Sequence, residues 1–273
     1  MRKIEFVKVS PTQNMTLLIK TPLEKKDYLQ VAGKLISYDN VHAEQAGYIQ
    51  APRDPRAKGM LSMMAGEFCG NATLSYGAWL MHKEGMKVGA EASFFLEVSG
   101  AKDLVGCSIR RRETDYYGIV DMPLPGRIEE KAFVFEGETY MLPMVTFPGI
   151  THILVDRALW GVRAKEYAQR AVETWREQMP EVFGILLWDA VCCYMEPLVY
   201  VAGASLVWER GCGSGTSAIG AYLAERTGKN IRMEIEQPGG TMEVSAQCCG
   251  KGLLRLQIAG AARIVAEGVA YIE

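Results

Sequence analysis

Two cysteines stand in the same local context at two distant points of the chain. Residues 69–80 read CGNATLSYGAWL, and residues 212–223 read CGSGTSAIGAYL. Each cysteine comes directly before small residues that run into an amphipathic helical pattern, and Asn71 and Ser214 are good N-cap residues. We therefore expect each thiol at a helix N-terminus, where backbone N–H groups and the helix dipole favour a thiolate and can bind an anion.

The chemistry open to such a pair of thiols is proton transfer at a single carbon. If Cys69 and Cys212 faced each other across an amino acid, one thiolate could remove the α-proton and the opposite thiol could protonate the other face. The N–H groups at the helix starts would bind the substrate carboxylate and stabilise the negative charge that spreads onto it. The residues favour this paired site over two packing cysteines, which remain the alternative, because packing does not require the same thiol twice.

The two turns belong to a longer internal repeat. They share Cys, Gly, Thr, Gly, Ala and Leu at an offset of 143 residues, and the word Glu-Val-Ser occurs at 97–99 and again at 243–245. This period is far longer than that of solenoid units, so it indicates a duplicated domain. We expect an N-terminal lobe at 1–148 that carries Cys69 and a C-terminal lobe at 149–273 that carries Cys212. The final strand could return to the N-terminal lobe.

Hydropathy patterns predict the same order of elements in both halves. The predicted fold class is α+β, with two pseudo-symmetric lobes, each made of antiparallel strands wrapped around a central helix, and an active site in the cleft between them. Strand patterns occur at 4–9, 15–20, 152–155, 230–236, 241–247 and 253–258, helical patterns at 23–35 and 164–178, and a turn at 237–240.

Composition argues against several classes of function. A net charge of −2 gives no reason to expect nucleic acid or an anionic membrane as a partner. No apolar run approaches the roughly 18 residues of a membrane span. The N-terminus alternates apolar and charged residues instead of forming a secretion signal, so we expect a cytoplasmic protein.

The remaining cysteines and histidines give no sign of a metal site. Seven cysteines and three histidines show no ligand spacing, so we expect no metal. The glycine-rich stretch 211–216 lacks the lysine of a phosphate-binding loop. The five other cysteines are expected to be small buried side chains: Cys107, Cys192, Cys193, Cys248 and Cys249.

At these residues the sequence resembles the diaminopimelate epimerase superfamily. Cys69-Gly70-Asn71 is similar to the first catalytic turn of that family, and the segment from Glu209 and Arg210 through Cys212-Gly213-Ser214 to its second. The likeness implies a two-lobed fold, no pyridoxal phosphate or other cofactor, and a small-molecule amino-acid substrate. The substrate contacts that it implies are Asn14, Gln45, Gly70, Asn71, His152, Glu209, Arg210, Gly213 and Ser214, with Cys69 and Cys212 as the catalytic thiols.

Departures from the superfamily concern the substrate. Asparagines that would hold the distal end of diaminopimelate are missing at 62–65, at Ile150 and near Phe183. A charged distal end would then remain unpaired, so diaminopimelate is disfavoured. The chain is more similar to the histidine racemases of staphylopine-type metallophore biosynthesis, although its second turn is shorter. An apolar pocket of Met63, Met64, Ile150 and Phe183 would suit an uncharged ring or an aliphatic side chain.

Several alternatives stay open at this point. His152 could orient the substrate or a catalytic thiol, or be an ordinary hydrogen-bonded residue. Glu209 and Arg210 could hold the ammonium and carboxylate groups, and Glu44 could contact the substrate side chain. The leading hypothesis is a cofactor-independent histidine racemase. The alternatives are a diaminopimelate epimerase, a racemase of broad specificity and a non-catalytic amino-acid binding protein. The oligomeric state is not specified, and a homodimer is one option.

Overall fold

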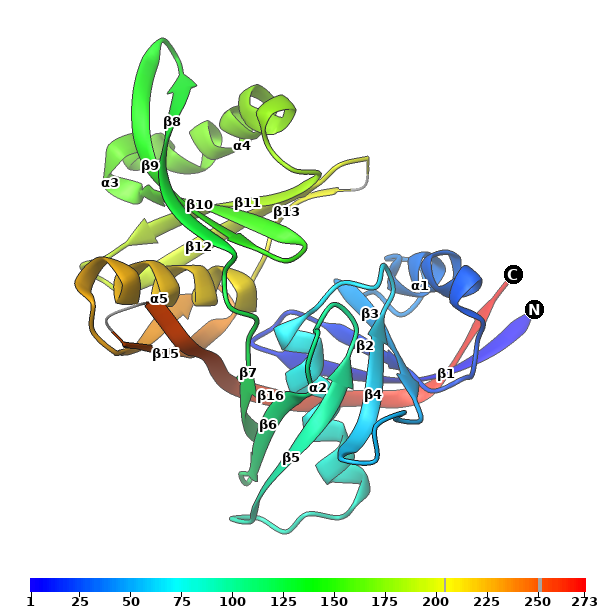
Figure 1. Cartoon of the computed structure of the whole chain (residues 1–273). Helices are drawn as coiled ribbons and strands as arrows, with labels where there is room; N and C mark the ends of the chain where they lie inside the picture. The colour runs from blue at the N-terminus through cyan, green and yellow to red at the C-terminus, as the bar shows by residue number, and fades with distance from the viewer. Residues whose placement is uncertain (204, 250–251) are drawn as a thin grey trace. The chain divides into compact units, whose positions relative to one another are not determined.

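The structure, a computed structural model, describes residues 1–203, 205–249 and 252–273 (Figure 1). It divides into two compact units, Met1–Met122 together with Ile258–Glu273, and Pro123–Gln257. The expected division at 148/149 lies inside the second unit, because the strands on either side of it, β9 and β10, pair with each other. The C-terminal residues of the chain belong to the first unit.

The first unit is a closed path of strands with a helix packed against them. Strand order follows the chain from β1 to β7, and β16 pairs with both β7 and β1 to close the path. The strands are β1 (Arg2–Pro11), β2 (Thr16–Ile19), β3 (Gln45–Gln50), β4 (Ala57–Met63), β5 (Glu91–Val98), β6 (Val105–Arg111), β7 (Tyr116–Asp121) and the C-terminal part of β16 (Gly252–Ile272).

Helix α2 (Gly70–Lys83) is the central helix of this unit. Twelve of its fourteen residues are buried, and it packs against β1, β2, β6 and β7. Small residues permit the close approach: a Cβ on Gly77 would lie 2.6 Å from the Cys107 sulfur. A second helix, α1 (Tyr28–Ile36), follows the short 3-10 helix η1 (Lys25–Asp27) and buries Val31 and Leu35 against residues of β1, β2 and β3.

The second unit repeats this organisation, with a central helix, an outer helix and a set of paired strands. Its central helix is α5 (Gly213–Thr227), which packs against β9, β10, β14 and β15, and its outer helix α4 (Ala164–Trp175) covers a cluster of aromatic residues around Trp175. The other elements are β8 (Arg127–Phe135), β9 (Glu138–Phe147), β10 (Ile150–Asp156), α3 (Arg157–Trp160), η2 (Gly161–Arg163), η3 (Arg176–Gln178), β11 (Val182–Asp189), β12 (Tyr194–Val201), β13 (Ser205–Trp208), β14 (Ile231–Gln237) and β15 (Gly240–Cys249).

Strand pairing follows the same order in the two units. In the first unit β1–β2 is antiparallel, β2–β3 parallel, β3–β4 antiparallel and β4–β5 parallel, and α2 lies between β4 and β5. In the second unit β9–β10, β10–β11, β11–β12 and β12–β14 follow the same sequence of senses, and α5 precedes β14. The sheets are therefore mixed and not purely antiparallel as expected, since a strand that continues past a helix crossover pairs in parallel.

One part of the sequence repeat is coincidental. The first Glu-Val-Ser word ends β5, the first strand after α2, whereas the second lies within β15, which is the second strand after α5. The residues at the position equivalent to the end of β5 are Gln237 and Pro238, at the end of β14. None of the helices in the described part of the chain has the length and hydropathy needed to cross a bilayer.

Candidate active site

Cys69 is itself the N-cap of helix α2. Its backbone is extended, with φ −134° and ψ 114°, and its sulfur accepts a hydrogen bond from the Ala72 N–H at 3.4 Å. The Thr73 hydroxyl and N–H both donate to the Cys69 carbonyl oxygen, at 2.8 and 3.0 Å. Asn71 therefore lies inside the first turn, and the prediction that it caps the helix is wrong. The sulfur holds the position where a side-chain oxygen normally satisfies a free N–H group.

Two polar residues distant in sequence meet at this cysteine. The Gln45 Oε1 atom lies 2.9 Å from the Cys69 sulfur, and the Gln45 Nε2 atom donates to Asn14 Oδ1 and to Thr16 Oγ1, each at 2.9 Å. The resemblance to the superfamily selected Asn14 and Gln45, and the structure brings them together. Thr16 was not among the substrate contacts that the resemblance implied, although it lies only two residues after Asn14.

The segment before Cys69 is held by the end of strand β5. Ser99 Oγ accepts from the Met63 N–H at 2.8 Å and donates to the Glu67 carbonyl at 2.7 Å, so one hydroxyl joins both ends of residues 64–66. Gly100, with φ +74°, lies so close that a Cβ there would be 2.3 Å from the Phe68 nitrogen. This contact requires glycine, and together with Ser99 it fixes the approach to the thiol.

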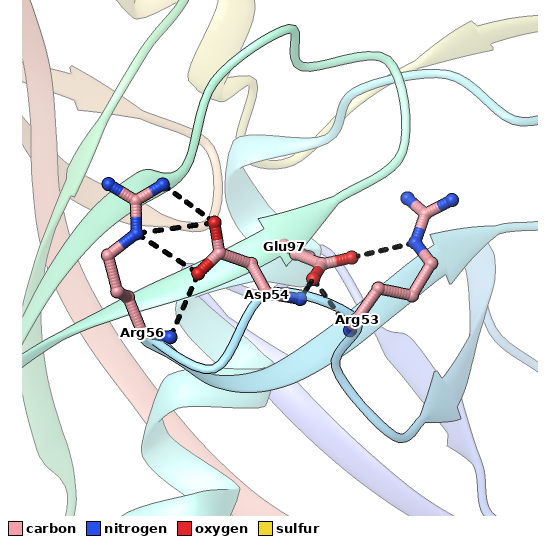
Figure 2. Close-up of polar contacts among 4 residues, drawn as sticks. All are labelled: Arg53, Asp54, Arg56 and Glu97. Atoms are coloured by element: carbon pink, nitrogen blue, oxygen red, sulfur yellow. Dashed lines mark hydrogen bonds and ion pairs between the residues drawn. The ribbon is translucent and has the colours of Figure 1, made fainter.

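Glu97, two residues earlier, holds the loop between β3 and β4. Its carboxylate accepts from the backbone N–H groups of Asp54 and Arg53 and from the Arg53 guanidinium (Figure 2). The hydrogen bond from the Asp54 N–H is the main reason why the pKa of Glu97 is lowered. Asp54 in turn pairs with Arg56 (Figure 2). The end of β5 therefore positions two loops with ordinary polar contacts.

Cys212 caps helix α5 in the same manner. Its sulfur accepts from the Gly215 N–H at 3.4 Å, and the Thr216 hydroxyl donates to the Cys212 carbonyl at 2.8 Å. The Cys212 N–H donates to Gln237 Oε1 at 2.7 Å, and Gln237 Nε2 donates to the Thr216 hydroxyl at 2.8 Å. Ser214, like Asn71, lies in the first turn and is not the N-cap that we expected. Sequence reasoning missed Gln237 as a support of this turn, although it recognised its turn motif.

The electrostatic environment of Cys212 favours the thiol. Only 4% of the residue is exposed, and this burial, followed by the nearby Glu209 carboxylate, raises its pKa well above the usual value. The Ser214 hydroxyl and the Gly215 N–H act in the opposite direction but are weaker. At Cys212 desolvation therefore opposes the helix start, which we expected to favour the thiolate, because burial disfavours the charged form.

His152 is connected to this thiol through a hydroxyl. Its Nε2 atom lies 2.9 Å from Ser214 Oγ, which lies 3.5 Å from the Cys212 sulfur. The ring is fully buried, and burial lowers the pKa of His152 to about 3, so the imidazole is neutral at physiological pH. Of the alternatives considered for His152, this geometry supports the orientation of a thiol.

Glu209 and Arg210 differ in their contacts. The Glu209 carboxylate lies near enough to the Cys212 thiol to raise its pKa, and the Glu209 N–H donates to the Pro197 carbonyl at 2.9 Å. The exposed Arg210 donates from its guanidinium to the Pro238 carbonyl at 3.0 Å, and its carbonyl accepts from the Gly239 N–H. Glu209 therefore acts directly on the thiol, whereas Arg210 joins the segment before Cys212 to the turn after β14.

Two expectations about side chains are wrong. Phe183 is fully buried in the aromatic core beneath α4, where it packs on Tyr200, so it does not line a pocket. Met63 and Met64 do line a cavity of about 520 Å³ in the first unit.

The non-catalytic cysteines are not uniformly buried. Cys107 is buried, Cys193 and Cys248 are half-buried, and Cys192 and Cys249 are exposed because their segments lie at a turn and a strand end.

Comparison with solved structures identifies the class of fold. The chain is similar to a hydroxyproline epimerase from Agrobacterium vitis, with a TM-score of 0.75 and 13% identity over 98% of this chain and 92% of the other. It is also similar to a probable proline racemase from Agrobacterium radiobacter, with a TM-score of 0.76 and 14% identity over 99% and 93% of the two chains. The fold is thus the mixed α+β fold of the proline racemase-like isomerases.

Sequence comparison specifies the family. The family model described as the histidine racemase CntK N-terminal domain matches residues 3–271, and the chain belongs to this family. It is 30% identical to a histidine racemase of Staphylococcus aureus over 99% of this chain and 98% of that protein. It is 28% identical to a histidine racemase of Fusobacterium nucleatum over 98% and 97% of the two chains. The protein is an amino-acid racemase, an isomerase.

Proposed function

We propose that this racemase interconverts L- and D-histidine without a cofactor, with Cys69 and Cys212 as the two acid–base groups. The observation that carries the proposal is the presence of a thiol at the N-cap of the central helix in both units. Duplication alone explains the matching helices but not the chemistry of their caps. The choice of histidine rests on the two relatives, which are aligned over nearly their whole length.

The reaction that we propose begins with the loss of a proton from Cys212. The Glu209 carboxylate, whose charge helps to raise the pKa of the Cys212 thiol, would accept the proton as substrate binds and as the substrate ammonium balances the charge of the thiolate. Ser214, held by the neutral His152, and the Gly215 N–H would stabilise the resulting thiolate.

The chemical step then exchanges one C–H bond for another. The Cys212 thiolate takes the proton from the α-carbon, and the electron pair left behind is delocalised into the substrate carboxylate. The Cys69 thiol delivers its proton to the opposite face of the same carbon, which inverts it. Backbone N–H groups of Gly70, Asn71, Gly213 and Ser214, at the starts of the two helices, would bind that carboxylate and stabilise its growing charge.

This mechanism requires a cleft in which the two units enclose the substrate, and we propose such a cleft as the active site. Arg210 and the remaining polar groups of the turns would line it. A cytoplasmic location and a homodimer remain predictions of the same kind. A small amino acid is the partner that the chemistry requires.

Exchange of the α-proton in heavy water tests the proposal. We expect purified protein to introduce deuterium at Cα of histidine, with equal final amounts of both enantiomers measured by circular dichroism. Cys69→Ser and Cys212→Ser should each lower kcat by at least about 10³-fold, the scale of lost acid–base catalysis, while the exposed Cys192→Ser serves as the control. Tight histidine binding without deuterium exchange would overturn the proposal, and faster turnover of proline or diaminopimelate would reassign the substrate.

A further inference from the structure

The contact between Gln45 and Cys69 has a definite chemical direction. Gln45 Nε2 carries two hydrogens, and both are used, toward Asn14 Oδ1 and Thr16 Oγ1. The Thr16 hydroxyl donates its hydrogen to the Asn14 backbone carbonyl at 3.3 Å, so toward Gln45 the hydroxyl oxygen acts as an acceptor. With the Nε2 atom engaged in this way, the Gln45 amide presents its carbonyl-type Oε1 atom to the Cys69 sulfur.

A strained turn supports this arrangement. Thr12 and Gln13 both have left-handed backbone angles, with φ +46° and +57°, although neither is glycine and threonine is β-branched. Such angles persist only where the surrounding structure imposes them, and they gather at functional sites. Here the turn is closed by the Asn14 N–H, which donates to the Pro11 carbonyl at 2.9 Å, and it delivers the Asn14 side chain to Gln45.

We infer that Gln45 is a positioning residue that keeps Cys69 in the protonated thiol form, so that Cys69 begins the reaction as the acid. The sulfur accepts one hydrogen bond from Ala72 N–H and faces an acceptor, Gln45 Oε1, at 2.9 Å. A thiol satisfies both partners, because it accepts and donates at once. A thiolate would leave the Gln45 oxygen facing a negative charge without a proton between them.

This inference rests on the proposed function and adds an asymmetry to it. Cys212 lies in the field of the Glu209 carboxylate, a group that can take a proton away, whereas Cys69 faces an amide oxygen, which cannot. Cys212 is then the thiol that can become the first base, and Cys69 the one that retains its proton until the α-carbon needs it. In the reverse reaction the roles exchange.

Other ionisable groups in the segments around Cys69 are directed elsewhere. Glu67 accepts from the Ala65 N–H at 3.0 Å, and Glu44 hydrogen-bonds the backbone of Met15. Burial raises the pKa of both carboxyl groups. The first two turns of α2, residues 70–77, contain no ionisable side chain apart from the buried Tyr76.

The pH dependence of Cys69 alkylation tests the inference without substrate. Intact protein is treated with iodoacetamide from pH 6 to 10, and mass spectrometry of peptides follows Cys69 separately from the other cysteines. Gln45→Met keeps the side-chain length but removes the acceptor, and we expect alkylation at pH 7 to rise about fivefold, which corresponds to about 1 kcal/mol for one hydrogen bond. Gln45→Glu places a charged acceptor at the same point and should slow alkylation.

Gln50→Met is the matched control. Gln50 lies on the same strand, and its amide contacts Tyr28 and Ser62, so its loss should leave the titration of Cys69 unchanged. The basic limb of the kcat/KM profile should move to lower pH in Gln45→Met and stay in place in Gln50→Met. Unchanged or slower alkylation in Gln45→Met would overturn the inference, whatever the substrate is. If Gln45→Met did not fold, the rate of Cys69 alkylation in Gln45→Glu would decide. A slower rate than in the unaltered protein would support the inference, and an equal or faster rate would overturn it.

Discussion

The support that Gln237 gives to the Cys212 turn leads to a stability prediction that can be worked from the structure. Gln237 is 2% exposed, and its amide accepts from the Cys212 N–H and donates to the Thr216 hydroxyl. Gln237→Leu preserves bulk but removes both bonds. The Thr216 hydroxyl keeps its own bond to the Cys212 carbonyl, so the Cys212 N–H is the main group that loses its partner.

The expected loss in the free energy of unfolding follows from the two hydrogen bonds that Gln237→Leu removes. A buried donor left without a partner costs about 1–3 kcal/mol, and the lost bond to Thr216 adds about 1 kcal/mol. Leucine regains part of this because it buries more apolar surface than glutamine. We therefore expect the free energy of unfolding to fall by about 2–3 kcal/mol, measured by urea denaturation at pH 7.

Gln247→Leu provides the matched control on the neighbouring strand. Gln247 is exposed on β15, so its replacement should change the free energy of unfolding by less than about 0.5 kcal/mol. Equal midpoints for Gln237→Leu, Gln247→Leu and the unaltered protein would refute the claim that Gln237 supports the turn. A Gln237→Leu protein of full stability whose Cys212 alkylation also matched the unaltered protein would refute it more strongly.

Three further predictions concern other parts of the two turns. Because burial lowers the pKa of His152 to about 3, the unfolded chain binds a proton there that the folded protein does not. The free energy of unfolding should therefore fall by about 1.6 kcal/mol between pH 6.5 and 5, and urea denaturation should show a flatter pH dependence for His152→Gln. Ser99→Ala removes both bonds that hold residues 64–66 and should cost about 1–2 kcal/mol and lower kcat/KM, whereas Ser93→Ala, on the exposed face of the same strand, should do neither. Native protein at pH 8 should be alkylated at the exposed Cys192 but not at Cys107, whose pKa is raised by full burial; peptide mass spectrometry would contradict this if Cys107 reacted first.

Local patterns in the sequence were sufficient for the elements that position the thiols. The expected strand at 4–9 lies inside β1, the helix at 164–178 corresponds to α4 with η3, and the turn at 237–240 joins β14 to β15. Each signal depends on residues adjacent in the chain, where hydrophobic period and turn chemistry act directly. The cysteine turns were placed correctly at the helix starts for the same reason.

What the sequence did not reveal depends on long-range contacts. Nothing near Cys212 in the chain shows that Gln237, 25 residues later, would bind its N–H. The start of helix α5 lowers the pKa of Cys212, but burial raises it and is the larger effect for a thiol that is 4% exposed. Likewise, the absence of an asparagine expected from the superfamily near Phe183 suggested that this residue lines a pocket, while its strand directs it into the core.

The two supports of the thiol turns show how a duplicated fold can retain a task while it changes the residues. Ser99 follows β5 and Gln237 ends β14. These strands are equivalent because each is the first after its central helix and pairs in parallel with a strand that precedes the helix, β4 for β5 and β12 for β14. Ser99 reaches the segment before its cysteine through Met63 and Glu67, whereas Gln237 reaches the Cys212 N–H directly. The approach to Cys212 from the preceding strand spans only residues 209–211, against 64–68 for Cys69, so a longer side chain can bond the cysteine itself.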